Sequence, residues 1–278
     1  MKFSIITPSF RNSEGLKLCI ASVADQEGVQ AEHIIQDACS DDGTQDWLPK
    51  DGRVRAFVEK DNGMYDAINR GYRRANGDLL AHLNSDEQYL PGALKAVHDF
   101  FEKNPSVEVL CGGVVVVGAD GGYVCHRHAL LPDTRTIYYR FNVLTASIFM
   151  RRRVIHERGF FLDSSWRAAA DALWFLSLVK ARVPMTTTDL FTSTFTDDGK
   201  NLSLSPVGRK ETLQMQAMAP FWVRWLKPVW IAHHRLRRLS AGHFDMKSAH
   251  YEVYTPQSPA KRVRFDVPNP TGVWRNRL

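Results

Sequence analysis

The feature that most constrains the fold is an alternation of short β-branched runs with helical apolar stripes over residues 3–117. The run at 3–7 stops at Pro8, and apolar side chains then recur over 16–23 at the i, i+3, i+4 and i+7 spacing of a helix. The same reading predicts further strands at 33–36, 53–58, 79–83 and 107–117, and helices at 64–75 and from Pro91 to about 103. This succession predicts an α/β fold built from parallel βαβ units with right-handed crossovers.

The length of 278 residues allows one large domain with an appendage. We expect a main domain at 1–208, made of two halves at 1–105 and 106–208. The remainder, 209–278, is expected to be a basic, mainly helical extension that is rich in Trp and Arg and ends in a polar tail. It carries 13 Lys and Arg against 4 Asp and Glu, a net charge of +9, whereas the whole chain is only +6.

Polar clusters follow three of the predicted strands. Thr7-Pro8-Ser9 comes after the first, residues 37–42 after the second, and Asn84-Ser85-Asp86-Glu87 after the fourth. In parallel α/β sheets a ligand lies in the crevice outside the carboxyl ends of the strands. We therefore expect one crevice to collect all three clusters.

The chemistry available to this crevice is that of carboxylates. Neither a G-x-x-x-x-G-K-[ST] loop nor a G-x-G-x-x-G turn after the first strand occurs, which disfavours kinase-like and dinucleotide-dependent functions. Mg²⁺ and Mn²⁺ are typically held by one or two carboxylates together with substrate phosphates. The acidic turn at 84–87 therefore predicts a divalent metal site beside a diphosphate, although acids in a turn are by themselves a weak signal.

Four motifs in order resemble family 2 glycosyltransferases of the GT-A fold, particularly members that build bacterial polysaccharides. They are 4–11 (SIITPSFR), 36–44 (QDACSDDGT), 61–71 (DNGMYDAINRG) with 75–78 (ANGD), and the acidic turn followed by 90–94 (LPGAL). The match covers residues 3–95 closely and reappears around 145–200. The resemblance implies a GT-A-like sandwich with a mostly parallel central sheet and a sugar-transfer activity that uses a nucleotide-linked donor. It makes 1–208 the catalytic domain, with 1–105 as the nucleotide-sugar-binding half and 106–208 as the acceptor half.

The resemblance also assigns roles to individual residues. It implies that the donor is held by Thr7, Pro8, Ser9, Asp37, Asp66, Asn69, Ser85 and Asp86. It implies that Asp86 is the direct ligand of Mg²⁺ or Mn²⁺, with Glu87 or Ser85 assisting. Many relatives have an acid where this chain has Ala38 and Asn84. Asp86 is therefore left with most of the metal binding, and the identity of the nucleotide base stays open.

Sugar transfer needs a base, because an acceptor hydroxyl is a poor nucleophile until its proton is removed. Inverting relatives supply an acid from the start of a helix in the second half of the domain. Asp171, in a helix expected over 168–181, is the only acid between Asp163 and Asp189 and is the predicted base. Ala170 stands where relatives often have a second acid. The alternative is an acid favoured at a helix N-terminus only by the helix dipole.

The extension places aromatic and basic residues side by side over 211–240. That composition suits a helix lying in the headgroup region of an anionic membrane. The alternative is that the tryptophans pack on the catalytic domain. Four widely spaced cysteines without a C-x-x-C pair predict reduced thiols in a cytoplasm. Membrane contact by the extension would place the protein peripherally on the inner face of the plasma membrane.

The predicted function is transfer of a sugar, with inversion, from a nucleotide-sugar, with UDP favoured. The acceptor is a saccharide or polyprenyl-linked chain of a bacterial surface polysaccharide such as exopolysaccharide or lipopolysaccharide. One alternative is a nucleotidyltransferase that makes sugar nucleotides, but residues 8–12 lack the glycine-rich basic loop of that class. Another is a nucleic-acid-binding protein that uses the basic extension. Acids at the strand ends would repel phosphate backbones, so we expect no nucleic acid partner.

Overall fold

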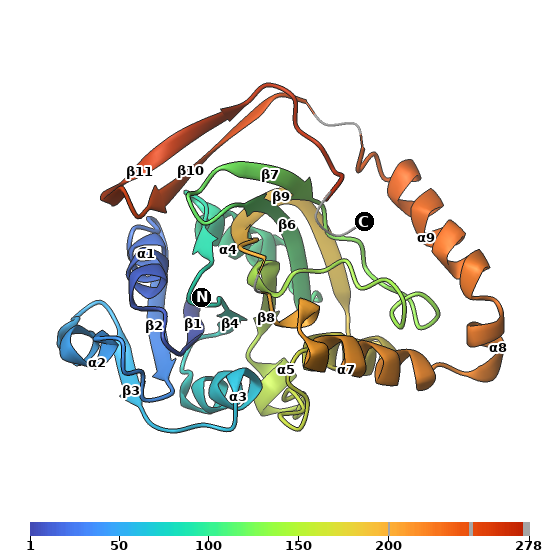
Figure 1. Cartoon of the computed structure of the whole chain (residues 1–278), viewed down its shortest axis with the longest axis horizontal. Helices are drawn as coiled ribbons and strands as arrows, with labels where there is room; N and C mark the ends of the chain where they lie inside the picture. The colour runs from blue at the N-terminus through green and yellow to red at the C-terminus, as the bar shows by residue number, and fades with distance from the viewer. Residues whose placement is uncertain (200, 245–246, 275–278) are drawn as a thin grey trace.

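A computed structural model describes residues 1–199, 201–244 and 247–274. Its centre is a nine-stranded sheet of order β3-β2-β1-β4-β8-β6-β9-β5, with β7 paired to β6 (Figure 1). The strands are β1 (Lys2–Ser9), β2 (Gln30–Asp37), β3 (Arg55–Val58), β4 (Leu79–His82), β5 (Gln88–Tyr89), β6 (Val109–Val117), β7 (Tyr123–Arg127), β8 (Ile148–Arg151) and β9 (Met185–Thr196). Strands β1, β2, β3, β4, β6 and β9 point one way and β5, β7 and β8 the other. The predicted α/β sandwich with a mostly parallel sheet is confirmed.

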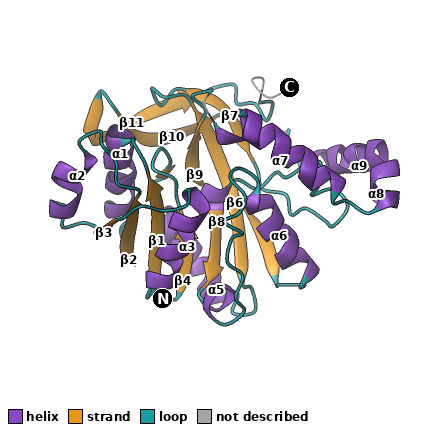
Figure 2. Cartoon of the chain, turned by 60° about the horizontal axis from the view of Figure 1, so that its bottom comes forward, coloured by secondary structure: helices purple, strands orange, loops and turns teal. Residues whose placement is uncertain are grey.

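Helices cover both faces of the sheet. They are α1 (Ser13–Ala24), α2 (Thr44–Trp47), α3 (Met64–Arg74), α4 (Ala93–Lys103), α5 (Arg153–His156) and α6 (Ala170–Lys180). On one face, Phe3 and Ile5 of β1 pack with α1 and α4. Figure 2 looks onto the other face, where α3, α5 and α6 pack on Ile6 and on the strands beside it. Both faces of β1 are thus apolar, which is why its residues read as a continuous β-branched run.

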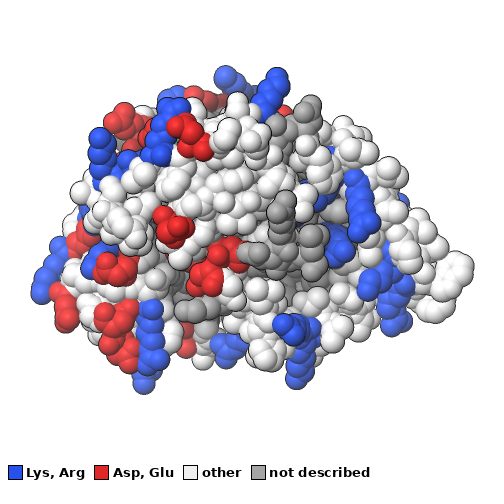
Figure 3. Space-filling model, turned by 45° about the horizontal axis from the view of Figure 1, so that its top comes forward, with Lys and Arg blue, Asp and Glu red and all other residues white. Residues whose placement is uncertain are grey.

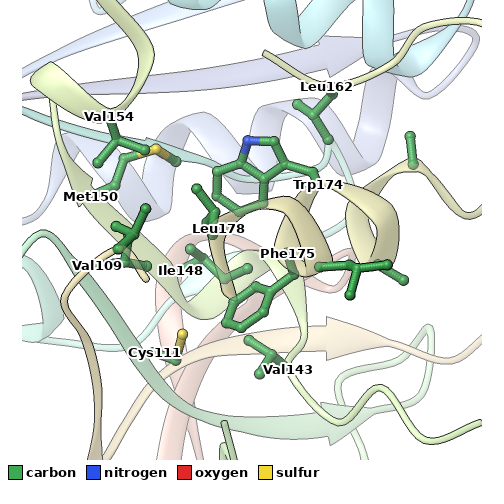
Figure 4. Close-up of a cluster of buried hydrophobic side chains, with 14 of the residues drawn as sticks. Val109, Cys111, Val143, Ile148, Met150, Val154, Leu162, Trp174, Phe175 and Leu178 are labelled. Carbon is green, nitrogen blue, oxygen red and sulfur yellow. The ribbon is translucent and has the colours of Figure 1, made fainter. Parts of the chain in front are cut away.

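Helix α6 is anchored by aromatic side chains of its own sequence. Trp174 and Phe175 are buried against side chains from β6 and β8, among them Cys111 and Ile148 (Figure 4). The indole of Trp174 also donates a hydrogen bond to the carbonyl of Phe160 at 2.6 Å. This packing fixes the first turn of α6, where Asp171 lies.

Gly71 sets the distance between α3 and β1. A Cβ added to it would collide with the buried side chain of Ile6. We expect Gly71→Ala to lower the free energy of unfolding by about 1–3 kcal/mol, the usual cost of overpacking a core, even though alanine favours the helix by about 1 kcal/mol. Chemical denaturation measures this change. Gly52→Ala is the control, because nothing lies near the position its Cβ would take; equal effects of the two substitutions would contradict the steric explanation.

The C-terminal part combines three helices with a hairpin. Helices α7 (Pro206–Ala217), α8 (Phe221–Trp225) and α9 (Lys227–Ser240) agree with the predicted helical extension. The boundary predicted at residue 208 falls inside α7. Strands β10 (Ala249–Thr255) and β11 (Ser258–Val267) form an antiparallel hairpin where the sequence had indicated only a polar tail. Its buried side chains pack on β6 and on Leu90, so the hairpin lies across one edge of the sheet (Figure 1).

No helix in the described ranges is both long and apolar enough to cross a bilayer.

Candidate active site

One large cavity, of about 990 Å³, opens at the carboxyl ends of β1 and β4. Pro8, Ser9 and Phe10 line it from the end of β1, and the acidic turn at 84–87 lines it after β4. The N-terminus of α3 contributes Tyr65, and the first turn of α6 contributes Asp171. The crevice expected from the parallel strands therefore exists, and it lies between the two predicted halves of the catalytic domain.

The acidic turn is held in shape by hydrogen bonds within the turn and from two neighbouring segments of the chain. The backbone N–H of Asn84 donates to Glu87 Oε2 at 2.8 Å, and the N–H of Glu87 donates to the carbonyl of Asn84 at 3.0 Å. Thr196, at the end of β9, donates its hydroxyl to the carbonyl of Asp86 at 2.5 Å. Asn12 bonds Ser85 Oγ at 3.0 Å and ties the turn to the loop after β1. Asp86 is the carboxylate of the turn that keeps an exposed surface.

The electrostatics of this turn suit a cation. Burial raises the pKa of Glu87, and the neighbouring charge of Asp86 adds to that shift. Desolvation also raises the pKa of Asp86, with a further contribution from Asp198, which lines the same cavity. Carboxylates that resist ionising beside one another are stabilised when a divalent ion neutralises them.

A carboxylate can bind a divalent ion only through an oxygen that the protein leaves available. Glu87 is 1 % exposed and uses one oxygen within the turn, while its Oε1 is buried without a protein partner. No cluster of three or more His, Cys, Asp or Glu side chains with metal-binding geometry occurs in the described part of the chain. The residues therefore fit Mg²⁺ or Mn²⁺ held by one or two carboxylates together with substrate phosphates, which is sufficient for these ions. Glu87 supports the turn through Oε2, and because its Oε1 has no protein partner, its assisting role at the metal stays a prediction.

Asp171 lies in the first turn of α6 with its carboxylate toward the cavity. Burial raises its pKa to about 6, and the more distant charge of Glu211 acts in the same direction. The hydroxyl of Tyr65 donates to Asp171 Oδ1 at 3.4 Å and opposes the shift. A carboxylate that titrates near neutral pH beside a cavity has the properties of a general base.

The loop before α6 is fixed by Glu211, a residue of α7. Its carboxylate accepts the backbone N–H groups of Arg167 at 2.7 Å, Ala168 at 2.8 Å and Ala169 at 3.0 Å. Glu211 is buried and supplies a negative charge where the N-terminus of α6 carries unpaired donors. The guanidinium of Arg167 in turn reaches the carbonyl of Asn62 in the loop before α3. Two loops that border the cavity are thus joined through α7.

We expect Glu211→Ala to lower the free energy of unfolding by about 2 kcal/mol, because it removes a charged cap and leaves buried N–H groups unpaired. The lost charge should also lower the pKa of Asp171 and move the acidic limb of the rate profile to lower pH. Thermal unfolding and a pH–rate profile measure both effects. Gln214→Ala, at an exposed position of the same helix, is the matched control; a loss of stability no greater than that of this control would contradict the capping role.

Four predicted donor-binding residues do not line the cavity. Thr7 bonds His33 at 2.8 Å, and Asp37 accepts the N–H and hydroxyl of Ser40. Asp66 pairs with Arg70 at 2.8 Å, and Asn69 is buried and bonds the backbone of Leu162. Their polar atoms have protein partners in this structure, and direct contact of these side chains with a donor stays a prediction. Pro8, Ser9, Ser85, Asp86, Glu87 and Asp171 do line the cavity.

The structure adds residues that the sequence reading did not single out. Tyr65, Asp61 and Lys60 line the cavity beside the α3 N-terminus, and Tyr138 and Tyr139 line it from the loop after β7. Burial raises the pKa of Asp61. The motif at 61–71 marked the region of Tyr65 and Asp61, whereas nothing local marks Glu211, which acts on residues 42 to 44 positions away.

The fold and the cavity define an α/β protein with carboxylates gathered at the carboxyl ends of parallel strands, the arrangement of enzymes that act on diphosphate-linked substrates through a divalent ion. The chain belongs to glycosyl transferase family 2, whose family model matches residues 4–160.

Relatives with names of their own match over part of the chain. The Bacillus subtilis protein named "Putative teichuronic acid biosynthesis glycosyltransferase TuaG" is 34% identical over 102 residues, which cover 35% of this chain and 40% of that protein. A "PGL/p-HBAD biosynthesis glycosyltransferase" of Mycobacterium bovis is 29% identical over 163 residues, 56% of this chain and 62% of that protein. The chain thus spans less than two thirds of the length of either relative.

Among solved structures, S. aureus TarS 1–349 in complex with UDP-GlcNAc superimposes with a TM-score of 0.62 at 20% sequence identity. The superposition covers 77% of this chain and 64% of that one. A second crystal structure of the same protein, in complex with UDP, gives a TM-score of 0.60. At this identity the likeness establishes the shared fold.

Proposed function

We propose that this glycosyltransferase moves a sugar from a UDP-sugar to a hydroxyl of a saccharide or lipid-linked acceptor, with inversion at the anomeric carbon. The observation that carries the proposal is that Asp86 and Asp171 line one cavity of about 990 Å³ from opposite halves of the domain. That arrangement separates a site for the diphosphate from a base for the acceptor. The TarS complexes with UDP-GlcNAc and UDP support UDP as the nucleotide.

In this proposal the chain's own residues divide the reaction between them. Asp86 and Ser85 lie on the diphosphate side, and Pro8 and Ser9 border the nucleoside. Mg²⁺ or Mn²⁺ bound at Asp86 would supply positive charge beside the leaving diphosphate. Asp171 accepts the proton of the acceptor hydroxyl as that oxygen attacks the anomeric carbon from the face opposite the nucleotide, so a single displacement inverts the configuration.

The acceptor class and the location belong to the same proposal. The relatives named for teichuronic acid and for PGL/p-HBAD biosynthesis support an acceptor of a surface polysaccharide or glycolipid. Four free thiols, three of them buried, support a reducing compartment such as the cytoplasm. A polyprenyl-linked acceptor would bring the enzyme to the inner face of the plasma membrane.

A donor screen tests this function. Purified protein is incubated with UDP-, GDP- and dTDP-sugars and Mg²⁺ or Mn²⁺, and nucleotide release is followed together with thermal shift. We expect UDP-sugars to give both signals, and we expect NMR of a transferred product to show the inverted anomer. Retained configuration would overturn the single displacement. Release of pyrophosphate from a nucleoside triphosphate and a sugar phosphate, without sugar transfer, would instead support a nucleotidyltransferase.

A further inference from the structure

Helices α8 and α9 carry a row of apolar side chains that no described part of the chain covers. Trp225, Val229, Leu236 and Leu239 recur at helical spacing, and Ala232 fills the remaining position of the row. Trp225 is 76 % exposed, Leu236 63 % and Leu239 64 %. Phe221 lies one turn earlier at 76 % exposure, and Trp222 is 50 % exposed with one edge packed on Trp230, at 5.8 Å between the ring centroids. We call Phe221, Trp222, Trp225, Val229, Leu236 and Leu239 the docking face.

The opposite side of the same helices packs on the protein. Val223 and His234 are buried, and Trp230 contacts the guanidinium of Arg135 at 4.9 Å. Arg237 donates to the carbonyl of Leu131 at 2.9 Å and fixes the rotation of α9. One side of the α8–α9 pair therefore packs on the rest of the protein, as one alternative for the extension predicted. The other side is exposed and is the candidate for membrane contact. Large exposed apolar patches of this kind mark interaction sites.

The basic residues around the docking face indicate which kind of partner it binds. Residues 212–244 contain five Lys and Arg and no Asp or Glu. Figure 3 shows acidic side chains over one half of the molecule, whereas the end formed by α8 and α9 shows only basic and uncharged ones. Among the described residues, Asp133 forms an ion pair with Arg237 of α9 at 3.9 Å. A second copy of this chain packed on the same face would bring basic residues together, whereas an anionic lipid surface would neutralise them.

We propose that the docking face binds an anionic bilayer, with α8 and α9 lying in the headgroup region. Exposed tryptophan and phenylalanine rings fit that boundary, and Arg224 and Arg235 lie on exposed positions beside them, where they can meet lipid phosphates. At 14 residues, α9 is roughly 21 Å long, too short to cross the bilayer and suited to lying along it. This binding does not depend on the proposed donor or reaction.

The proposal also fixes how the cavity lies relative to the lipid. Thr212 and Met215 of helix α7 line the cavity. Helix α7 is followed in the chain by α8. Leu213 of α7 and Met218, which follows the helix, are exposed as well. A bound enzyme would hold the acceptor side of the cavity close to the membrane surface, where a lipid-linked acceptor is anchored.

Flotation of the full chain with phosphatidylcholine vesicles, with and without 30 % phosphatidylglycerol, tests the proposal. We expect binding to the anionic vesicles that falls at 0.5 M NaCl, and an at least tenfold loss of binding in Trp225→Ser/Leu236→Ser. Leu190→Ser, at an exposed apolar position on β9, should bind like wild type. Because every changed side chain is exposed, thermal unfolding and UDP release should stay unchanged.

A second variant keeps the test independent of folding. Arg224→Glu/Arg235→Glu should lose binding to anionic vesicles to the same degree if the apolar double variant does not fold. Wild-type protein that fails to bind anionic vesicles, or variants that bind as wild type does, would overturn the proposal. Light scattering that shows a dimer which Trp225→Ser/Leu236→Ser converts to a monomer, without vesicle binding, would assign the face to self-association.

Discussion

Asp86→Asn is expected to lower metal-dependent sugar transfer by about 10³-fold. The basis is that a bound divalent ion stabilises the departing diphosphate by several kcal/mol, and each 1.4 kcal/mol corresponds to a factor of ten. Asp86 is the exposed carboxylate of the acidic turn and lines the cavity, whereas Glu87 is buried, so we expect Asp86 to be the principal ligand. Initial rates of UDP release over a Mn²⁺ titration, together with Mn²⁺ binding in the presence of UDP, measure the effect.

Two further variants separate metal binding from a general loss of structure. Glu87→Gln should keep most of the activity, because an amide oxygen can still accept the N–H of Asn84. Asp99→Asn, whose exposed carboxylate pairs with Lys95 on the surface of α4, should behave as wild type. Wild-type turnover by Asp86→Asn, or full activity of the native chain in EDTA, would remove the metal from the proposal. A loss by Glu87→Gln as large as that of Asp86→Asn would assign the ligand to both residues.

Asp171→Asn is expected to cost about 10²–10⁴ in rate, the usual contribution of a general base. With the pKa of Asp171 raised to about 6, the wild-type rate should rise with pH through about 6 and level off above it, since the base must be ionised. The variant should lack that limb. Tyr65→Phe removes the hydroxyl that stabilises the ionised form, so it should move the limb to higher pH while transfer continues.

The raised pKa of Asp171 also predicts how the Asp171→Asn substitution affects stability. Because burial raises the pKa of Asp171 above its unfolded value, ionisation costs stability as the pH rises from about 4 to about 6. Asp171→Asn should therefore be at least as stable as wild type at pH 7, and any loss of activity is not a loss of fold. Thermal unfolding at pH 5 and pH 7 measures this. Unchanged turnover, or an acidic limb near pH 6 that survives the substitution, would assign the base to another residue.

The sequence determined the elements whose patterns are local. The β-branched run at 3–7 and the helical stripe at 64–75 appear as β1 and α3, because buried faces impose their period on neighbouring residues. Parallel strands bring their carboxyl ends together, so the turn with Asp86 and the loop with Ser9 could be placed at one crevice without coordinates. Family membership followed from the same motifs, and residues 4–160 match the family model.

Other parts of the fold were not predicted from the sequence. Strand β9 was not expected, because its side chains are only partly buried and give no clear period. The β10–β11 hairpin was taken for a polar tail, since one of its faces is exposed and the other is buried only by contact with the sheet and Leu90.

Only the tertiary structure decided which polar groups are free to act. Thr7 and Asn69 lie in the right motifs, yet each bonds a partner that its motif does not contain, His33 and Leu162. Asp37 and Asp66 bond residues of their own motifs, Ser40 and Arg70. Glu211 appeared to belong to a separate extension, and it caps the helix that carries Asp171. Apolar periodicity acts between neighbours in the chain and can be read from residue types. Hydrogen-bond partners across 40 or more residues depend on how the elements pack, and no local pattern records them.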